Sequence, residues 1–332
     1  MSKVVHSGNL IRSGAAAAAL ALTLVLGAGG VASRARRQQP RPKPGEEEEV
    51  VRVETRLVGI PFTVRSRGGG YVGDLRRDEL RVYEDGVEQR VTHFESAGEP
   101  INVVLLLDFS PSVRADLPAA REAAAAFLEQ LRPDDRVGAV AFASEAVVLF
   151  GGGVGDRGTL REAILKSRVG GAGATALHDA VIFTLTRVVG TARGRKAVLL
   201  FTDGWDTSSR RGSLERSLNS AEESDAPVHV VWLGEGIPGG GSGPRREGES
   251  YLRELARRSG GRFQLAGGRD GMVKTLASVA EELRAQYQVG FYASGELRPG
   301  KRRKLKVVVT RAGVSVRAKE SYVVPESGGA RP

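Results

Sequence analysis

Between residues 101 and 286 the sequence alternates apolar runs of five to seven residues with longer segments whose apolar residues recur at helical spacing. Runs without polar alternation are typical of strands that are buried on both faces, as in a parallel sheet covered by helices. The pattern therefore predicts a Rossmann-like, doubly wound, mainly parallel α/β domain over residues 99–286. The expected strands are Ile101–Leu107, Val137–Phe142, Ala197–Thr202, Val228–Leu233 and, shorter, Phe263–Leu265.

Helical spacing of apolar residues marks the segments between these strands. The stretch 234–249 is rich in glycine and is expected to be a surface loop. The expected helices are Leu117–Leu131, Thr159–Lys166, Leu177–Val189, Leu214–Glu223, Tyr251–Ser259 and Val273–Gln286.

The segments on either side of this domain show strand-like alternation instead. Residues 50–98 contain short alternating runs, including Leu80–Tyr83 and Val87–Phe94, which are separated by the turn signal Asp85-Gly86. Residues 287–324 contain three more such runs, at 287–293, 304–310 and 314–318. We expect the two β-segments to pack together as a small β-unit beside the α/β domain.

The first 49 residues have the features of an export signal and a linker. Lys3 and Arg12 precede a short apolar stretch, and the small residues Gly30 and Ala32 precede Ser33, so a signal peptide over residues 1–32 is predicted. A retained membrane anchor is the alternative, because the apolar stretch could be extended. Residues 33–49 are proline-rich and polar and predict a disordered linker, and residues 325–332 a disordered tail. The chain is expected to be exported, to the periplasm, the cell surface or the medium.

Composition excludes several functional classes. The chain has no cysteine, which removes disulfides, thiolate nucleophiles and Cys-ligated metals. Its formal net charge of +10 suggests nucleic acid, but the excess lies at the two ends, and no aromatic residue interleaves the basic run 301–304. That run is an ordinary basic terminus or an electrostatic patch. We expect no nucleic-acid partner.

Oxygen-bearing side chains follow two of the expected strands. Asp108, Ser110 and Ser112 come directly after the first strand, and Asp203 follows the strand 197–202. Thr175 lies at the end of a glycine-rich loop. Because ligands of open α/β sheets bind beyond the carboxyl ends of the strands, these five side chains are expected to converge.

The chemistry of this set points to a hard cation. Carboxylate and hydroxyl oxygens without His or Cys suit Mg²⁺ first, with Mn²⁺ or Ca²⁺ possible. Two carboxylates are few for a divalent ion, so waters or a carboxylate from outside should complete the coordination.

The motifs D-x-S-x-S after a buried strand, a Thr in a Gly-rich loop and T-D-G after a later strand resemble the von Willebrand factor type A domain and its metal-ion-dependent adhesion site. The flanking segments resemble those of its secreted bacterial relatives. The resemblance implies that Ser110, Ser112 and Thr175 ligate the cation, and that Asp108 and Asp203 bind it directly or through water. It also implies adhesion to a protein that offers an Asp or Glu.

The expected function is therefore an exported, non-enzymatic interaction module. Trp205 and Asp206, beside the motif, are candidate partner contacts, although Trp205 could equally cover the loop, and Asp206, like Asp179, could brace it. One rival is an envelope scaffold that works through its β-segments, with the cation as a brace. A second is a hydrolase with a triad Ser110–His178–Asp203, although the nucleophile motif G-x-S-x-G is missing from the sequence.

Overall fold

The computed structural model describes residues 56–153, 156–168, 173–233, 243–293, 295 and 297–325. The predicted signal peptide, the linker and most of the predicted tail lie outside these residues. Among the described residues, no helix combines the length and the apolar character needed to cross a membrane.

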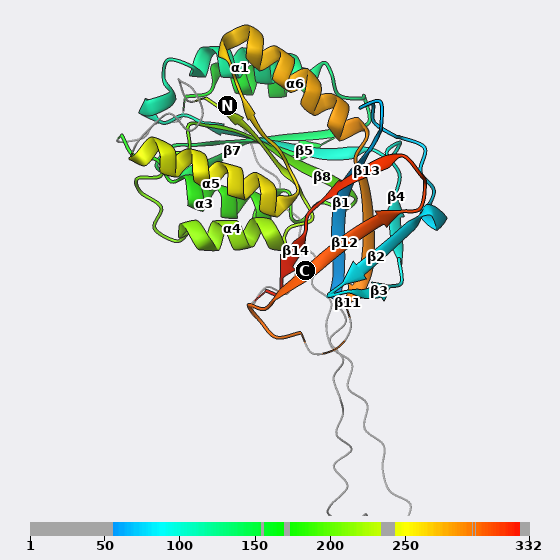
Figure 1. Ribbon diagram of the computed structural model, residues 1–332. Coiled ribbons are helices and arrows are strands. Elements are labelled where there is room, and N and C mark those ends of the chain that lie inside the picture. Colours follow the sequence, from blue (N-terminus) through cyan, green and yellow to red (C-terminus); the bar gives the residue numbers. More distant parts are fainter. Residues whose placement is uncertain are drawn as a thin grey trace, which may run out of the picture. The chain divides into compact units, whose positions relative to one another are not determined.

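A six-stranded sheet forms the α/β part of the fold, with strand order β10-β9-β8-β5-β6-β7 (Figure 1). All pairs in it are parallel except β6 with β7. The mainly parallel sheet expected from the apolar runs is confirmed. Its strands are β5 (Ile101–Asp108), β6 (Arg136–Phe142), β7 (Ala146–Gly153), β8 (Arg195–Thr202), β9 (Val228–Trp232) and β10 (Phe263–Leu265).

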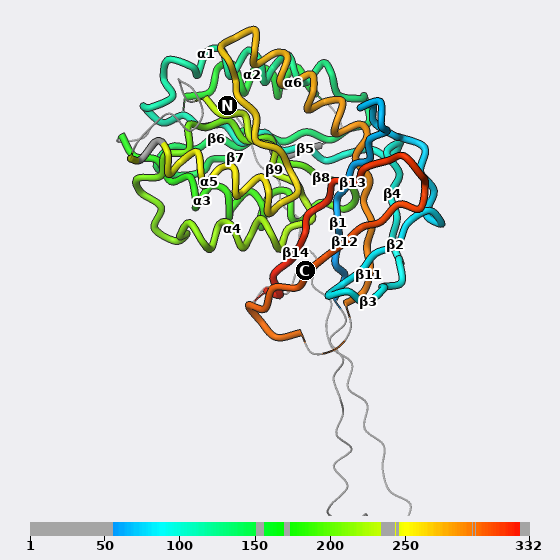
Figure 2. Tube along the Cα trace, in the orientation of Figure 1, coloured from blue at the N-terminus to red at the C-terminus, as the bar shows by residue number. Residues whose placement is uncertain are grey.

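Helices cover both faces of this sheet. On one face lie α1 (Leu117–Leu128), α2 (Arg157–Lys166) and α6 (Gly268–Arg284), whose buried residues share one core with alternate residues of β5 and β8. On the other lie α3 (Leu177–Phe183) with the π-helical turn η3 (Thr184–Val188), α4 (Leu214–Glu223) and α5 (Pro244–Ser259). Figure 2 shows the sheet between the two helical layers. This arrangement explains why the central strands contain almost no polar residue.

The flanking segments form two further four-stranded sheets, β13-β1-β11-β4 and β14-β12-β2-β3. One hydrophobic core lies between them. The antiparallel pairing of β1 with β11 joins the segment before the α/β part to the segment after it, which confirms that the two pack together. The strands are β1 (Arg56–Ser66), β2 (Leu80–Glu84), β3 (Val87–Gln89), β4 (His93–Glu95), β11 (Tyr287–Ala293), β12 (Arg302–Val309), β13 (Val314–Ala318) and β14 (Ser321–Val323), with short 3-10 turns η1 (Arg77–Glu79) and η2 (Pro111–Val113).

The structure corrects three predictions. Helix α5 begins at Pro244, inside the segment predicted as a loop, because proline is well suited to the first turn of a helix. The predicted strand Val87–Phe94 is two strands, β3 and β4, which belong to different sheets. Strand β7, at the edge of the large sheet, was not predicted.

Candidate metal centre

The candidate centre lies at the carboxyl ends of β5 and β8. From β5 the chain first builds β6 on one side and later β8 on the other, so the strand order reverses at this point. The loops that follow β5 and β8 lead to helices on opposite faces of the sheet and leave a crevice between them, where ligands of such sheets bind.

Asp108, the last residue of β5, is buried, with 1% of its surface exposed. Its Oδ1 accepts a hydrogen bond from the Ser110 backbone N–H at 2.8 Å, and its Oδ2 accepts one from the Thr202 hydroxyl at 2.6 Å. Burial raises the pKa of Asp108 to about 6; the bonds from Thr202 and Ser110 oppose the shift, and the charge of Asp203 adds to it. A cation beside this carboxylate would relieve both the desolvation and the repulsion from Asp203.

The loop after Asp108 presents two hydroxyls side by side. Ser110 Oγ and Ser112 Oγ are 3.0 Å apart. Ser110 has extended backbone angles, as expected before Pro111, and Pro111 starts the turn η2. Ser110 is buried whereas Ser112 is exposed, so the pair runs from the interior to the surface.

Thr175 is buried and is held by the loop that follows Asp203. Its backbone N–H donates to the Thr207 hydroxyl at 2.8 Å, and its carbonyl accepts from the N–H groups of Thr207 and Ser208 at 2.8 and 3.0 Å. The residue after it, Ala176, donates to the carbonyl of Ala143, just beyond β6. These bonds fix the Thr175 loop to the same edge of the sheet as Asp108 and Asp203.

Asp203 is half-buried and shapes the last loop. Its Oδ1 accepts from the Trp205 backbone N–H at 3.1 Å. Gly204 has a φ of +88°, and a side chain there would lie 2.9 Å from the backbone of Gly248 in α5, so only glycine fits. The next residue, Trp205, is 40% exposed.

The other acidic residues near the centre brace its loops. Asp206 accepts hydrogen bonds from the N–H groups of His178 and Ser209, at 2.9 and 3.2 Å, and from the Ser209 hydroxyl. Asp179 accepts from the N–H groups of Arg210 and Arg211. The bracing interpretation of both residues therefore fits, and Trp205 is the better candidate for a partner contact.

The hydrolase rival requires contacts that the described residues do not make. The carboxylate beside His178 is that of Asp206, whose Oδ2 lies 3.3 Å from His178 Nδ1, and not that of Asp203. The His178 ring packs edge-on against the Tyr251 ring, with 4.7 Å between the ring centres. Burial lowers the pKa of His178. Ser110 Oγ bonds to Ser112. In the described part of the chain, no hydrogen bond or ion pair joins Ser110, His178 and Asp203 into a triad.

The donor set fits a hard cation better than a soft one. Within the described ranges, no three His, Cys, Asp or Glu side chains come together as a metal site. The candidate ligands are two carboxylates and the hydroxyls of Ser110, Ser112 and Thr175, and oxygen ligands of this kind suit Mg²⁺.

Residues 102–263 match the sequence profile of the von Willebrand factor type A domain. This match identifies the α/β part as a von Willebrand factor type A domain. No curated protein sequence matches the chain. The family assignment favours an interaction module over an enzyme.

Several solved structures resemble the chain. BatB from Bacteroides thetaiotaomicron is 23% identical, with a TM-score of 0.44, over 55% of this chain and 98% of that one. A von Willebrand factor type A protein from Catenulispora acidiphila is 15% identical, with a TM-score of 0.47, over 82% and 75%. Proximal thread matrix protein 1 from the mussel byssus, with a zinc-occupied metal-ion-dependent adhesion site, is 18% identical, with a TM-score of 0.47, over 60% and 49%.

Sequence reasoning missed Thr202 and Thr207. Thr202 is fully buried and bonds to Asp108, and Thr207 holds the Thr175 loop. Thr202 is the first residue of the T-D-G motif, so its position in the motif was the available signal. Thr207 carries no comparable signal, because its partner is 32 residues away along the chain.

Proposed function

We propose that this chain is an exported, non-enzymatic module that binds an Asp or Glu side chain of a partner protein through Mg²⁺. The cation would be held by Asp108, Ser110, Ser112, Thr175 and Asp203. The observation that carries the proposal is the buried Asp108 carboxylate, which lies beside a pair of hydroxyls at the point where the strand order reverses.

Charge explains why such a site would take an acidic ligand. Two carboxylates can at most neutralise a divalent cation. One of them, Asp203, also accepts a hydrogen bond from the N–H of Trp205 through its Oδ1. Neutral hydroxyls supply the remaining protein ligands. A position left to water can therefore accept a third carboxylate, which adds both a ligand and a charge.

We propose that Trp205 contacts the partner protein beside the cation. It is one of the few large apolar side chains that are exposed in the described residues, and the Asp203–Gly204 turn holds its backbone in place. Exposed tryptophans commonly supply much of the binding energy of an interface.

Export rests on the first 32 residues, whose basic start, apolar stretch and small residues fit a cleaved signal. These residues lie outside the described part of the chain. N-terminal sequencing of the protein recovered outside the cytoplasm is expected to begin at Ser33.

The test uses Asp108→Ala together with a matched control, Asp134→Ala, an exposed aspartate in the loop that precedes β6 at the other end of the sheet. Immobilised protein is exposed to cell-envelope extract in Mg²⁺ and in EDTA. We expect a partner that is captured by the wild type and by Asp134→Ala in Mg²⁺, and is lost in EDTA and with Asp108→Ala. Trp205→Ala should weaken capture without changing Mg²⁺ affinity.

Cation-independent capture would contradict the proposal and favour the β-segments as the binding surface. Deleting residues 50–98 would not separate the two explanations, because it removes β1, an inner strand of its sheet, and exposes the core beneath. Circular dichroism of each point variant establishes that the fold is retained.

A further inference from the structure

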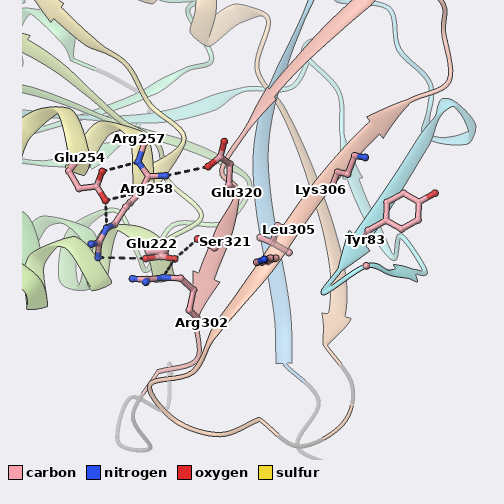
Figure 3. Close-up of a pocket in the computed structure, with 12 residues that line it drawn as sticks. Tyr83, Glu222, Glu254, Arg257, Arg258, Arg302, Leu305, Lys306, Glu320 and Ser321 are labelled. Atoms are coloured by element: carbon pink, nitrogen blue, oxygen red, sulfur yellow. Dashed lines mark hydrogen bonds and ion pairs between the residues drawn. The ribbon is translucent and has the colours of Figure 1, made fainter.

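A cleft of about 820 Å³ lies between the α4–α5 side of the von Willebrand domain and the outer face of β2 and β12. Figure 3 shows its two walls, one from the helices and one from the β-strands. None of the five proposed cation ligands lines it. The labelled lining residues are Tyr83, Glu222, Glu254, Arg257, Arg258, Arg302, Leu305, Lys306, Glu320 and Ser321.

The carboxylates in the cleft are already paired with arginines. Glu254 is 2.7 Å from both Arg257 and Arg258, and Arg257 also lies 3.3 Å from Glu320. Glu222, which is buried, accepts from Arg302 at 2.7 Å. Three acids are thus offset by three arginines of the same cleft.

The other two basic residues of the cleft are lysines of β12. Lys304 and Lys306 are exposed, and within the described residues neither side chain has a carboxylate partner. They are alternate residues of one strand, so their side chains leave the same face of the sheet about 6.6 Å apart along it. The cleft therefore has an excess of two positive charges with a defined spacing.

The walls of the cleft are held together at its base. Glu222 of α4 binds Arg302 of β12 and the hydroxyl of Ser321 of β14. The buried Lys319 donates to the carbonyls of Glu222 and Ser224, at 3.3 and 2.9 Å, where α4 ends. Because these bonds join the von Willebrand domain to the β-unit, the cleft is formed before any ligand arrives.

We propose that this cleft binds an extended peptide segment of a partner protein that carries Glu or Asp on alternate residues. In an extended chain, alternate side chains lie on one face and repeat at the same interval as Lys304 and Lys306. Tyr83, beside Lys306 in the register of β2 and β12, offers a ring for the peptide backbone to pack on. Only Lys304 and Lys306 add net positive charge to the cleft, so a polymer that is negatively charged at every unit, such as polyphosphate, would place most of its charges beside groups that are already paired.

The test measures fluorescence anisotropy of a labelled peptide, Glu-Ser-Glu-Ser-Glu-Ser, with the full mature chain. A peptide of the same composition, Glu-Glu-Ser-Ser-Glu-Ser, has no glutamates two residues apart and is the spacing control. Lys304→Glu/Lys306→Glu is compared with Lys274→Glu, an exposed lysine of α6 outside the cleft. Inorganic polyphosphate is the third probe.

We expect the alternating peptide to bind more tightly than the spacing control, and the double reversal to weaken its binding at least about tenfold, because attraction becomes repulsion. Lys274→Glu should have no effect. Equal binding of both peptides, equal binding by the double variant, or binding of polyphosphate but not of the peptide would each overturn the proposal. Binding should persist in EDTA and in Asp108→Ala, so failure here and failure of the cation-dependent function are separate results.

Discussion

His229 gives the sharpest prediction for the stability of the fold. It lies in β9, only 2% of its surface is exposed, and neither of its ring nitrogens has a hydrogen-bond partner among the described residues. Burial, and then the nearby charges of Arg317 and Arg262, lower its pKa to about 3. The folded protein therefore keeps this ring neutral under conditions in which the unfolded chain protonates it.

The sign and size of the effect follow from this difference. Below the ordinary His pKa of about 6.5 the unfolded chain binds a proton that the folded chain does not, so stability falls as the pH falls from there towards 3. At about pH 5 the loss from this one residue is about 2 kcal/mol, and at about pH 7.5 it is close to zero. The value at pH 5 does not depend on the folded pKa so long as that pKa lies well below 5.

The measurement is urea unfolding, followed by circular dichroism, at these two pH values. His229→Leu and His229→Gln cannot titrate, so each should lose about 2 kcal/mol less than the wild type on acidification. Groups that titrate in all three proteins cancel in the comparison. At the higher pH, His229→Leu should be at least as stable as the wild type, because it removes unpartnered buried nitrogens. A wild-type pH dependence that survives in both variants would refute the reasoning.

Two further predictions concern single contacts. Thr202→Val removes the hydroxyl that donates to Asp108 at 2.6 Å. It should lower Mg²⁺ affinity about 10–100-fold, measured by calorimetry, while the fold persists. Unchanged affinity would mean that the Thr202 hydrogen bond is not needed to position Asp108. Gly261→Ala places a methyl group 2.0 Å from the carbonyl oxygen of Val228, so it should lower the stability of the fold by about 1–3 kcal/mol or prevent folding. The control Gly98→Ala makes only an ordinary contact at 3.5 Å and should leave stability unchanged. Equal melting temperatures of the two variants would contradict the close packing at Gly261.

The parallel sheet could be predicted because its strands are buried on both faces and so contain almost only apolar residues. Strands β5, β6, β8 and β9 differ from their predicted ranges by a residue or two. Strand β7 escaped prediction because it is an edge strand that ends in glycines, with Val147 and Val148 exposed. The start of α5 was missed because Gly243 and Pro244 resemble loop residues when read without the helix that follows.

The candidate centre was predictable where its residues are close in sequence. The spacing of Asp108, Ser110 and Ser112 places them on one turn, and their hydrogen bonds follow from that. The bonds between the loops around Thr175 and Thr207 depend on how distant segments meet. No local pattern encodes such contacts. The cleft beside β12 could not be predicted for the same reason, because α4, α5 and three strands build it together.

The central claim, a cation site built on Asp108, is tested most directly by isothermal titration calorimetry of Mg²⁺ into the metal-free protein and its Asp108→Ala variant. We predict one saturable binding event in the wild type that is absent from the variant, while Asp134→Ala binds like the wild type. Equal Mg²⁺ binding by wild type and Asp108→Ala, or no binding by either, would contradict the account.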